Sequence, residues 1–286
     1  MRERLRLAIP NKGRLVEPTL ALLHDAGLVF DEHDRNLVAQ VQNHPLDILF
    51  VRTGDVVEFV ADGVADAGIT GIDILAESGV PLSTLRPLGY GRCRLAAAVA
   101  ADAPFRAIED LAGLKVATSH PNTARAYFAD RGIPVEVISL SGAVEVAPRL
   151  GLADAIVDLV STGSTLAMNG LRAIGDILAS EAILVSSPVA QAQGADELDE
   201  IVTMLGSVLT ARGRKYLMMN APSTKLAELE ALLPGLESPS VIPLAHAGMI
   251  AIHSVVGADE VWGLLPRLKT AGASGILVLP IEKILP

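Results

Sequence analysis

The sequence predicts an α/β protein with two lobes, followed by a smaller βαββαβ unit of the ferredoxin-like type. Half of the 286 residues are apolar but only 3% are aromatic, so Ala, Val, Leu and Ile must build the core. This composition is typical of α/β proteins whose parallel strands are buried on both faces. Short apolar runs alternate with amphipathic segments, and after residues 211–214 the order of these segments changes.

The first lobe is predicted from residues 1–94 and 178–211. Each expected strand is an apolar run that ends in small or polar residues, and each expected helix carries apolar residues at helical spacing. The strands are expected over residues 5–9, 47–51, 67–69 and 182–185, and the helices over residues 14–25, 54–62 and 195–210.

The second lobe, residues 95–177, is predicted as a compact α/β insertion into the first. Its alanine-rich beginning indicates a buried strand and turn rather than a linker. The strands are expected over residues 94–100, 115–118, 135–140 and 155–160, and the helices over residues 123–131 and 142–150, with a last helix that continues through Leu171.

The third part, residues 212–286, predicts four strands and two helices in the order βαββαβ. Pro222 precedes the first helix and Asp259 and Glu260 lie in the first turn of the second, which favours these helix starts. We expect Trp262 in the core. The strands are expected over residues 216–220, 241–244, 249–255 and 276–280, and the helices over residues 223–233 and 258–271.

Charge and cysteine content exclude several classes of protein. The net charge of −10 argues against nucleic acid or an anionic membrane surface as the main partner. Cys93 is the only cysteine, so no disulfide can form within one chain, and a reducing compartment fits. No apolar run reaches the roughly 18 residues of a membrane span. We expect a cytoplasmic protein.

A strand that carries acids and ends in small hydroxyl residues is the strongest functional signal. Asp154 and Asp158 accompany the apolar run 155–160, and the next five residues have free backbone N–H groups and hydroxyls that suit a phosphate. The carboxylates suit sugar hydroxyls or a hydrated metal ion, so the segment favours a phosphorylated sugar. The alternative is an ordinary turn with a helix cap. The loop residues are Ser161, Thr162, Gly163, Ser164 and Thr165.

Further polar residues follow other strands, at the sheet edge where open α/β sheets bind ligands. Lys12 and Arg14 suit a diphosphate or a nucleotide, although a solvated turn explains them equally well. Asp73 near a helix start is either a ligand contact or a cap. The remaining candidates at such positions are Arg52, Gly71, Arg92 and His120.

Covalent catalysis has no strong candidate in the sequence. The six histidines show no metal-binding spacing, and no G-x-S-x-G motif is present. Glu145 and Arg149 read as an ordinary helical pair, unless the site needs the acid.

The chain resembles the ATP phosphoribosyltransferases, and the resemblance runs nearly end to end. The long signature comprises Glu145, Gly151 and residues 153–166, which read ADAIVDLVSTGSTL. One departure is His120, where the family usually carries tyrosine. Shorter matches are PNKGRL at residues 10–15, GITG at 68–71, TSHP at 118–121, LESP at 236–239 and GILVLP at 275–280.

The resemblance implies transfer of phosphoribosyl from phosphoribosyl pyrophosphate to N1 of ATP, with release of pyrophosphate, as the first step of histidine biosynthesis. The loop 161–165 would hold the ribose 5-phosphate, and Asp154 and Asp158 the ribose hydroxyls or metal-bound water. Lys12 and Arg14, with Arg52, would neutralise phosphates. Mg²⁺ is implied, carried by the substrate or held by one of the two acids. Positioning and electrostatics would supply the catalysis.

The resemblance also implies a two-lobe catalytic part like a periplasmic binding protein, assembly into dimers and hexamers, and inhibition by histidine bound to the terminal domain. That domain alternatively serves only oligomerisation. The rival functions are an exported solute receptor, which the lack of a signal peptide disfavours, and a two-lobe deaminase or aminotransfer-type enzyme. The expected effector contacts are Asn220, Leu236, Glu237, Ser238 and Ser240.

Overall fold

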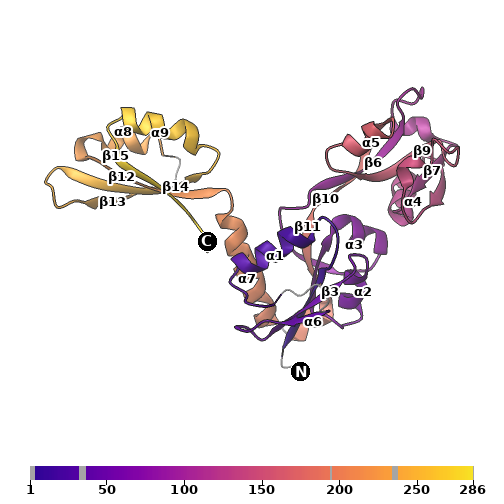
Figure 1. Cartoon of the computed structure of the whole chain (residues 1–286), viewed down its shortest axis with the longest axis horizontal. Helices are drawn as coiled ribbons and strands as arrows, with labels where there is room; N and C mark the ends of the chain where they lie inside the picture. The colour runs from indigo at the N-terminus through magenta and orange to yellow at the C-terminus, as the bar shows by residue number, and fades with distance from the viewer. Residues whose placement is uncertain (1–3, 32–36, 194, 234–237, 286) are drawn as a thin grey trace. The chain divides into compact units, whose positions relative to one another are not determined.

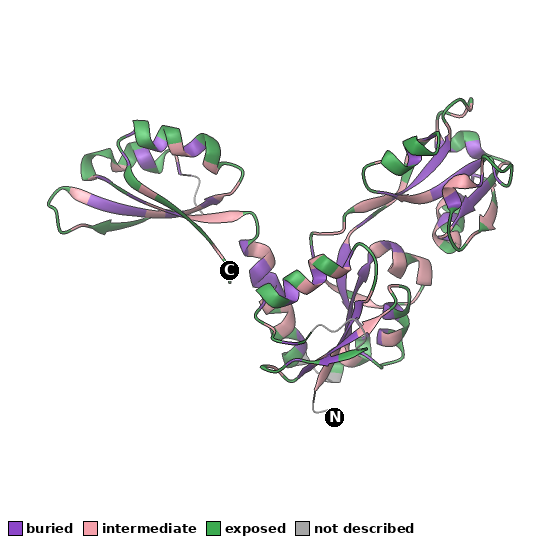
Figure 2. Cartoon of the chain, viewed as in Figure 1, coloured by how far each residue is buried: buried purple, intermediate pink, exposed green. Residues whose placement is uncertain are grey.

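The computed structural model describes residues 4–31, 37–193, 195–233 and 238–285 (Figure 1). Its contacts divide the chain into two compact units, Met1–Val202 and Thr203–Pro286. The first unit contains a six-stranded and a five-stranded sheet, and the second contains a four-stranded sheet. Buried residues concentrate in the strands of each sheet and on the helix faces that cover them (Figure 2).

The six-stranded sheet has the order β2-β3-β1-β4-β11-β5. Strand β1 runs parallel to β3 and β4, so the carboxyl ends of these three strands lie at one edge. The strands are β1 (Leu5–Pro10), β2 (Val38–Gln40), β3 (Leu46–Val51), β4 (Ala67–Gly71), β5 (Ser83–Pro87) and β11 (Ala182–Ser186). The helices of this region are α1 (Val16–Asp25), α2 (Asp55–Ala61), α3 (Ile72–Ser78) and α6 (Pro188–Gln193), and α7 (Ala195–Ala211) continues from this unit into the second.

The five-stranded sheet has the order β10-β6-β9-β7-β8. Its middle strands consist of small and branched apolar residues because both of their faces are covered: Leu95, Ala97 and Val99 face one core cluster, and Ala96 and Ala98 face another. The strands are β6 (Cys93–Ala100), β7 (Lys115–Thr118), β8 (Glu136–Ser139), β9 (Ala155–Val160) and β10 (Leu171–Ser180), and the helices are α4 (Pro121–Asp130) and α5 (Ser164–Met168).

Strands β6 and β10 form an antiparallel pair from Cys93–Ser180 at one end to Ala100–Leu171 at the other. The pair crosses both boundaries predicted between the lobes, at residues 94–95 and 177–178. The prediction of a helix that continues through Leu171 is wrong, because α5 ends at Met168 and strand β10 begins at Leu171. Pairing with β6 at eight positions outweighs the local helical pattern.

The prediction of a helix over residues 142–150 is wrong. Only the 3₁₀ turn Val144–Val146 forms there, and Ala143 before it has a left-handed backbone with φ of 50°. Pro148 lacks the amide donor that a longer helix needs, which explains the early end. The strand predicted over residues 155–160 is confirmed as β9. Strands β2 and β5 were not expected.

The second unit has the strand order β13-β14-β12-β15, with every neighbour antiparallel. Along the chain the order is βαββαβ, so the expected ferredoxin-like unit is confirmed (Figure 1). Leu217, Met219, Ile252 and Leu268 are at the centre of its core. The strands are β12 (Arg214–Pro222), β13 (Ser240–Pro243), β14 (Met249–Gly257) and β15 (Ser274–Pro280), and the helices are α8 (Leu226–Glu230) and α9 (Val261–Thr270).

Trp262 is not in the core, contrary to expectation, because its side chain is 92% exposed. Helix α9 packs through Leu264 and Leu268, which are four residues apart and share one helix face. Trp262 therefore lies on the opposite, solvent side of α9. Among the described residues, no helix is long and apolar enough to cross a membrane.

Candidate active site

Strand β9 leads directly into the loop predicted to bind phosphate. Gly163 has φ of 84°, a left-handed conformation that glycine adopts without strain, and α5 begins at the next residue. The hydroxyls of Thr162 and Ser164 lie 3.0 Å apart on the exposed side of the turn. The N–H groups of Thr162 and Gly163 make no hydrogen bond within the described part of the chain. The loop thus presents hydroxyls and backbone donors to solvent, as an anion site requires.

Asp158 lies near the carboxyl end of β9, just before the loop. Burial raises the pKa of Asp158, and the nearby charge of Glu145 raises it further. A hydrogen bond of 2.8 Å from the Leu159 N–H, followed by the charge of His120, partly opposes these effects. The charges of Glu145 and His120 therefore both act on Asp158 beside the loop. Glu145 lies in the 3₁₀ turn and acts on Asp158 rather than as half of an ordinary helical pair.

Asp154 lies at the other end of β9. Four residues of strand separate it from Asp158, which amounts to about 13 Å. Its side chain is exposed, and its Oδ2 accepts a hydrogen bond of 2.9 Å from the Lys115 N–H. The structure does not bring Asp154 to the loop, so we leave it out of the candidate site.

The carboxyl ends of β1 and β3 bring two of the predicted cations together. The Asn11 N–H donates to the Val51 carbonyl at 2.7 Å, and the Thr53 hydroxyl donates to the Lys12 carbonyl at 3.2 Å. These bonds hold the segments that carry Lys12 and Arg52 side by side.

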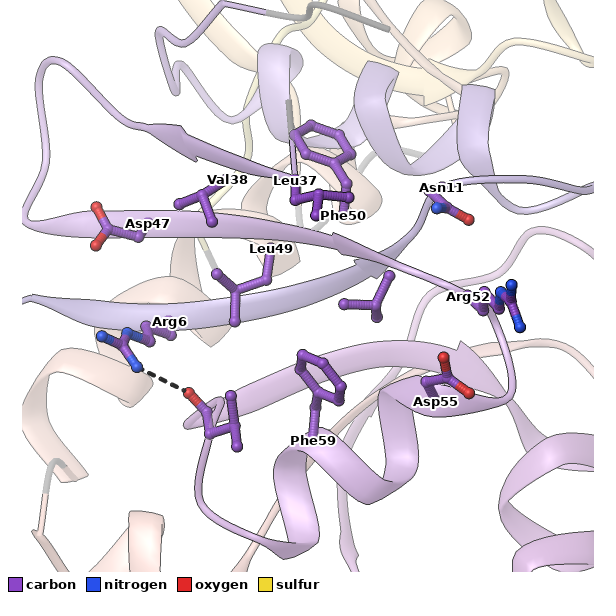
Figure 3. A pocket seen from close by; sticks show the side chains of 12 residues that line it. Arg6, Asn11, Leu37, Val38, Asp47, Leu49, Phe50, Arg52, Asp55 and Phe59 are labelled. Carbon is purple, nitrogen blue, oxygen red and sulfur yellow. Dashed lines mark hydrogen bonds between the residues drawn. The ribbon is translucent and has the colours of Figure 1, made fainter. Parts of the chain in front are cut away.

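A pocket of about 520 Å³ opens beside these segments. Figure 3 shows Asn11, Arg52 and Asp55 at one end of the pocket and Arg6 and Asp47 at the other. Apolar side chains, Phe59 among them, lie between the two polar ends. Arg52 therefore lies at the polar rim of a cavity large enough for a small ligand.

Asp73 is the most buried acid of the site, with 1% of its surface exposed. Its Oδ1 accepts from Arg14 Nη2 at 3.2 Å and from the Ser180 hydroxyl, while the Asp73 N–H donates to Ser180 Oγ at 3.1 Å. Its Oδ2 lies 3.7 Å from His120 Nε2, a distance for electrostatic attraction rather than a hydrogen bond. Burial alone would raise the pKa of Asp73, but His120, Ser180 and Arg14 together lower it to about 2.

His120 occupies the junction between β7 and α4 and is 5% exposed. Its N–H donates to Thr118 Oγ1 at 2.9 Å, and its Nδ1 lies 3.0 Å from Ser119 Oγ. Helix α4 begins at Pro121, directly after His120, and not at Thr123 as expected. The ring is therefore held by its own strand end on one side and faces Asp73 on the other.

Gly71 lies next to Asp73, whereas Arg92 does not. A Cβ built on Gly71 would overlap Asp73 Oδ1, so the absence of a side chain makes room for the carboxylate. Arg92 is largely exposed and forms an ion pair of 3.3 Å with Glu181. Gly71 joins the Asp73 cluster, whereas Arg92 makes no recorded contact with it among the described residues.

Two residues of the cluster were not proposed as site residues from the sequence, Ser180 and Cys93. Cys93 Sγ lies 3.1 Å from Arg14 Nη2. Burial raises the pKa of this thiol; the Arg14 charge lowers it and the Asp73 charge raises it. Ser180 is 107 residues from Asp73, and no local pattern connects them.

The expected effector residues lie in the second unit. Asn220 on β12 and Ser240 on β13 are exposed, and Ser238 precedes β13. Leu236 and Glu237 lie outside the described residues. The effector assignment stays a prediction.

Comparison with known proteins identifies the relatives of the chain. The family model described as ATP phosphoribosyltransferase matches residues 52–207, and that of HisG, C-terminal domain, matches residues 211–283. An ATP phosphoribosyltransferase from Gemmatimonas aurantiaca is 47% identical over 292 residues, which cover 99% of this chain and 100% of the relative. One from Cytophaga hutchinsonii is 44% identical over 280 residues, covering 98% of each.

A solved structure agrees with these matches. The ATP phosphoribosyl transferase (HisG:HisZ) complex from Thermotoga maritima contains a chain that superposes with a TM-score of 0.63 at 30% identity. The alignment covers 72% of this chain and 98% of that one. The two-lobe α/β fold agrees with this similarity, and the terminal ferredoxin-like unit is matched by the second family model. The chain belongs to the ATP phosphoribosyltransferase family.

Proposed function

We propose that this chain transfers the phosphoribosyl group of phosphoribosyl pyrophosphate to N1 of ATP and releases pyrophosphate. The observation that carries the proposal is the arrangement at the end of β9, where a half-buried Asp158 is followed by the exposed loop 161–165. A carboxylate for ribose hydroxyls next to donors for a phosphate suits a 5-phosphoribosyl group. Family membership supports the same reaction class.

The loop holds the 5-phosphate of the donor through the hydroxyls and N–H groups of residues 161–165. Asp158 accepts hydrogen bonds from the ribose hydroxyls. Because the C1 carbon gains positive charge as pyrophosphate leaves, the carboxylates of Asp158 and Glu145 also stabilise the transition state electrostatically. No protein nucleophile is needed, since N1 of the adenine attacks directly and its electron pair forms the new C–N bond.

Cations receive the negative charge of the phosphates. Lys12 and Arg52 lie on adjacent segments at the carboxyl ends of β1 and β3, and Arg14 lies beside Asp73. They neutralise the leaving pyrophosphate or the triphosphate of ATP. The ring of His120 contacts the adenine in the position where the family usually has tyrosine.

Mg²⁺ accompanies the donor substrate in this proposal. Among the described residues, no group of three or more His, Cys, Asp or Glu side chains is arranged to hold a metal ion. Mg²⁺ is commonly bound by one or two carboxylates together with substrate phosphates, and Asp158 would supply such a carboxylate. When bound, the ion screens the charge of the diphosphate.

We further propose that the reaction opens histidine biosynthesis in the cytoplasm and that histidine inhibits it through the ferredoxin-like unit. The chain carries this unit in addition to the catalytic part, which gives an effector a separate place to bind. The assembly is proposed to be a homo-oligomer.

Ultraviolet absorbance of the purified chain with ATP, phosphoribosyl pyrophosphate, Mg²⁺ and pyrophosphatase tests the reaction. We expect a new absorbance from the N1-substituted adenine, which Thr162→Ala weakens strongly. Thr210→Ala is the matched control, because this α7 hydroxyl donates only to the Gly206 carbonyl. No product from folded protein would refute the transfer. Product that histidine does not suppress would refute only the regulatory part.

A further inference from the structure

Asp73 contacts three side chains, and the proposed reaction uses two of them, Arg14 and His120. Asp73 is almost fully buried at the start of α3, so it cannot itself reach a bound substrate. Its two oxygens nevertheless point in different directions. Oδ1 accepts from Arg14 and Ser180, whereas Oδ2 faces His120 and has no hydrogen-bond partner among the described residues.

The contacts of Asp73 tie together distant parts of the first unit. Arg14 comes from the turn after β1, His120 from the start of α4, and Ser180 from the end of β10. Ser180 is paired with Cys93 at the first position of the β6–β10 pair, and Cys93 also contacts Arg14. The carboxylate therefore sits where the two sheets are joined.

The surroundings hold the carboxylate in one orientation. Ser180 both donates to Asp73 Oδ1 and accepts from the Asp73 N–H. Gly71 leaves the space that the carboxylate fills, because any Cβ there would overlap Oδ1. A buried acid with two hydrogen bonds at one oxygen and a shaped space around it is fixed rather than mobile.

Arg14 is oriented as a consequence. Its Nη2 contacts Asp73 and Cys93 and its Nε contacts the Gly91 carbonyl at 3.4 Å, while Nη1 has no partner in the part of the chain that the structure describes. One edge of the guanidinium is thus held by the protein, and Nη1 stays available for a phosphate oxygen. Because the guanidinium is planar, holding one edge sets the direction of the other.

We propose that Asp73 is a positioning residue for the transfer reaction, which orients Arg14 through one oxygen and the His120 ring through the other. This inference rests on the proposed function of the site. It differs from both alternatives that the sequence offered for Asp73, a direct ligand contact and a helix cap. The buried carboxylate of Asp73 thereby sets how the anion-binding Arg14 and the adenine-binding His120 are oriented toward the nucleotide.

Steady-state kinetics of Asp73→Asn tests the proposal. The variant keeps the shape but not the charge, and we expect kcat/KM for ATP to fall by about 10²-fold, the scale of a misplaced positioning group. KM for phosphoribosyl pyrophosphate at saturating ATP should change much less, because this proposal assigns Arg14 and His120 to the nucleotide. Asp66→Asn is the matched control, because Asp66 flanks the other end of β4 and its side chain bonds, within the described part of the chain, only the Arg6 N–H.

A double-mutant cycle separates positioning from general damage. If Asp73 acts through Arg14, the variant with both Asp73→Asn and Arg14→Ala loses less kcat/KM than the product of the two single losses. Ser180→Ala, which leaves Asp73 charged but less fixed, should give a smaller loss in the same direction. It also serves as the test variant if Asp73→Asn does not fold.

The outcomes distinguish the two proposals. An inactive but folded wild-type chain refutes the proposed function itself. An active wild type with unchanged kinetics in Asp73→Asn, or strictly multiplicative losses in the cycle, overturns the positioning role. A loss that Asp66→Asn matches would also overturn it, because the effect would then come from weakened β4 packing.

Discussion

The carboxylate of Glu77 accepts two hydrogen bonds from Thr123, one from its N–H and one from its hydroxyl, both 2.9 Å long. Glu77 belongs to α3 beside the six-stranded sheet, and Thr123 to the first turn of α4 beside the five-stranded sheet. The Asn122 N–H also donates to Glu77 at 2.9 Å. A side chain from one lobe therefore caps a helix of the other, immediately after His120.

Replacing Glu77 by alanine should remove this cap and destabilise the first unit. Helix caps are worth about 1 kcal/mol, and a charged acceptor at a helix N-terminus adds to that. Urea unfolding followed by circular dichroism measures the loss. Glu77→Gln, which still accepts hydrogen bonds but without the charge, should lose less. Equal stability of Glu77→Ala and wild type would contradict the capping role.

Asp158→Asn is expected to raise stability while it lowers activity. The folded protein raises the pKa of Asp158, so the unfolded chain loses this proton first as pH rises above 3.8. Ionised Asp158 therefore costs stability at neutral pH and nothing at low pH, where it is protonated in both states. Thermal unfolding at pH 7 and at pH 3 should show the variant's advantage only at the higher pH.

The activity of the same variant should fall by about tenfold or more, because a charged acceptor for ribose hydroxyls is lost. The absorbance assay measures this directly. A variant that is both destabilised at pH 7 and fully active would contradict the burial and the role proposed for Asp158.

The contribution of Asp73 to stability should depend on pH in the opposite direction to that of Asp158. The pKa of Asp73 is lowered from 3.8 to about 2, so this residue adds stability above the unfolded value and loses that contribution as pH falls toward 2. The shift corresponds to about 2 kcal/mol at neutral pH. The stability difference between wild type and Asp73→Asn should be largest at pH 7 and shrink below about pH 5. A difference that stays constant with pH would show that packing, not charge, is responsible.

The single thiol reports on the same cluster without any substrate. Burial raises the pKa of Cys93, and the Asp73 charge contributes to the rise. Because the thiolate is the reactive form, iodoacetamide should label wild type slowly at pH 8 and Asp73→Asn several-fold faster. Mass spectrometry of the labelled chain gives the rates, with Asp66→Asn expected to behave as wild type. Identical labelling rates in all three proteins would show that the charge of Asp73 does not influence the Cys93 thiol.

Much of the fold could be predicted because its patterns are local. The apolar run 155–160 ends where small hydroxyl residues begin, and β9 has the same bounds. The βαββαβ unit follows from alternating apolar runs and helix starts. Strand β10 could not be predicted, because most of the second lobe separates it in the sequence from its partner β6. The prediction that Trp262 lies in the core was wrong for a related reason. Several faces of α9 carry apolar residues, and only tertiary packing decides which face is buried.

For the site, the sequence by itself determined the chemical types and the local arrangement: a carboxylate on a strand, a hydroxyl-rich loop after it, and cations at strand ends. These depend on residues that are neighbours in the chain. Only the tertiary structure decided that Asp154 lies away from the loop and that Asp73 joins Arg14, His120 and Ser180. Those contacts link segments up to 107 residues apart, and they arise from strand order and core packing, which no local pattern encodes.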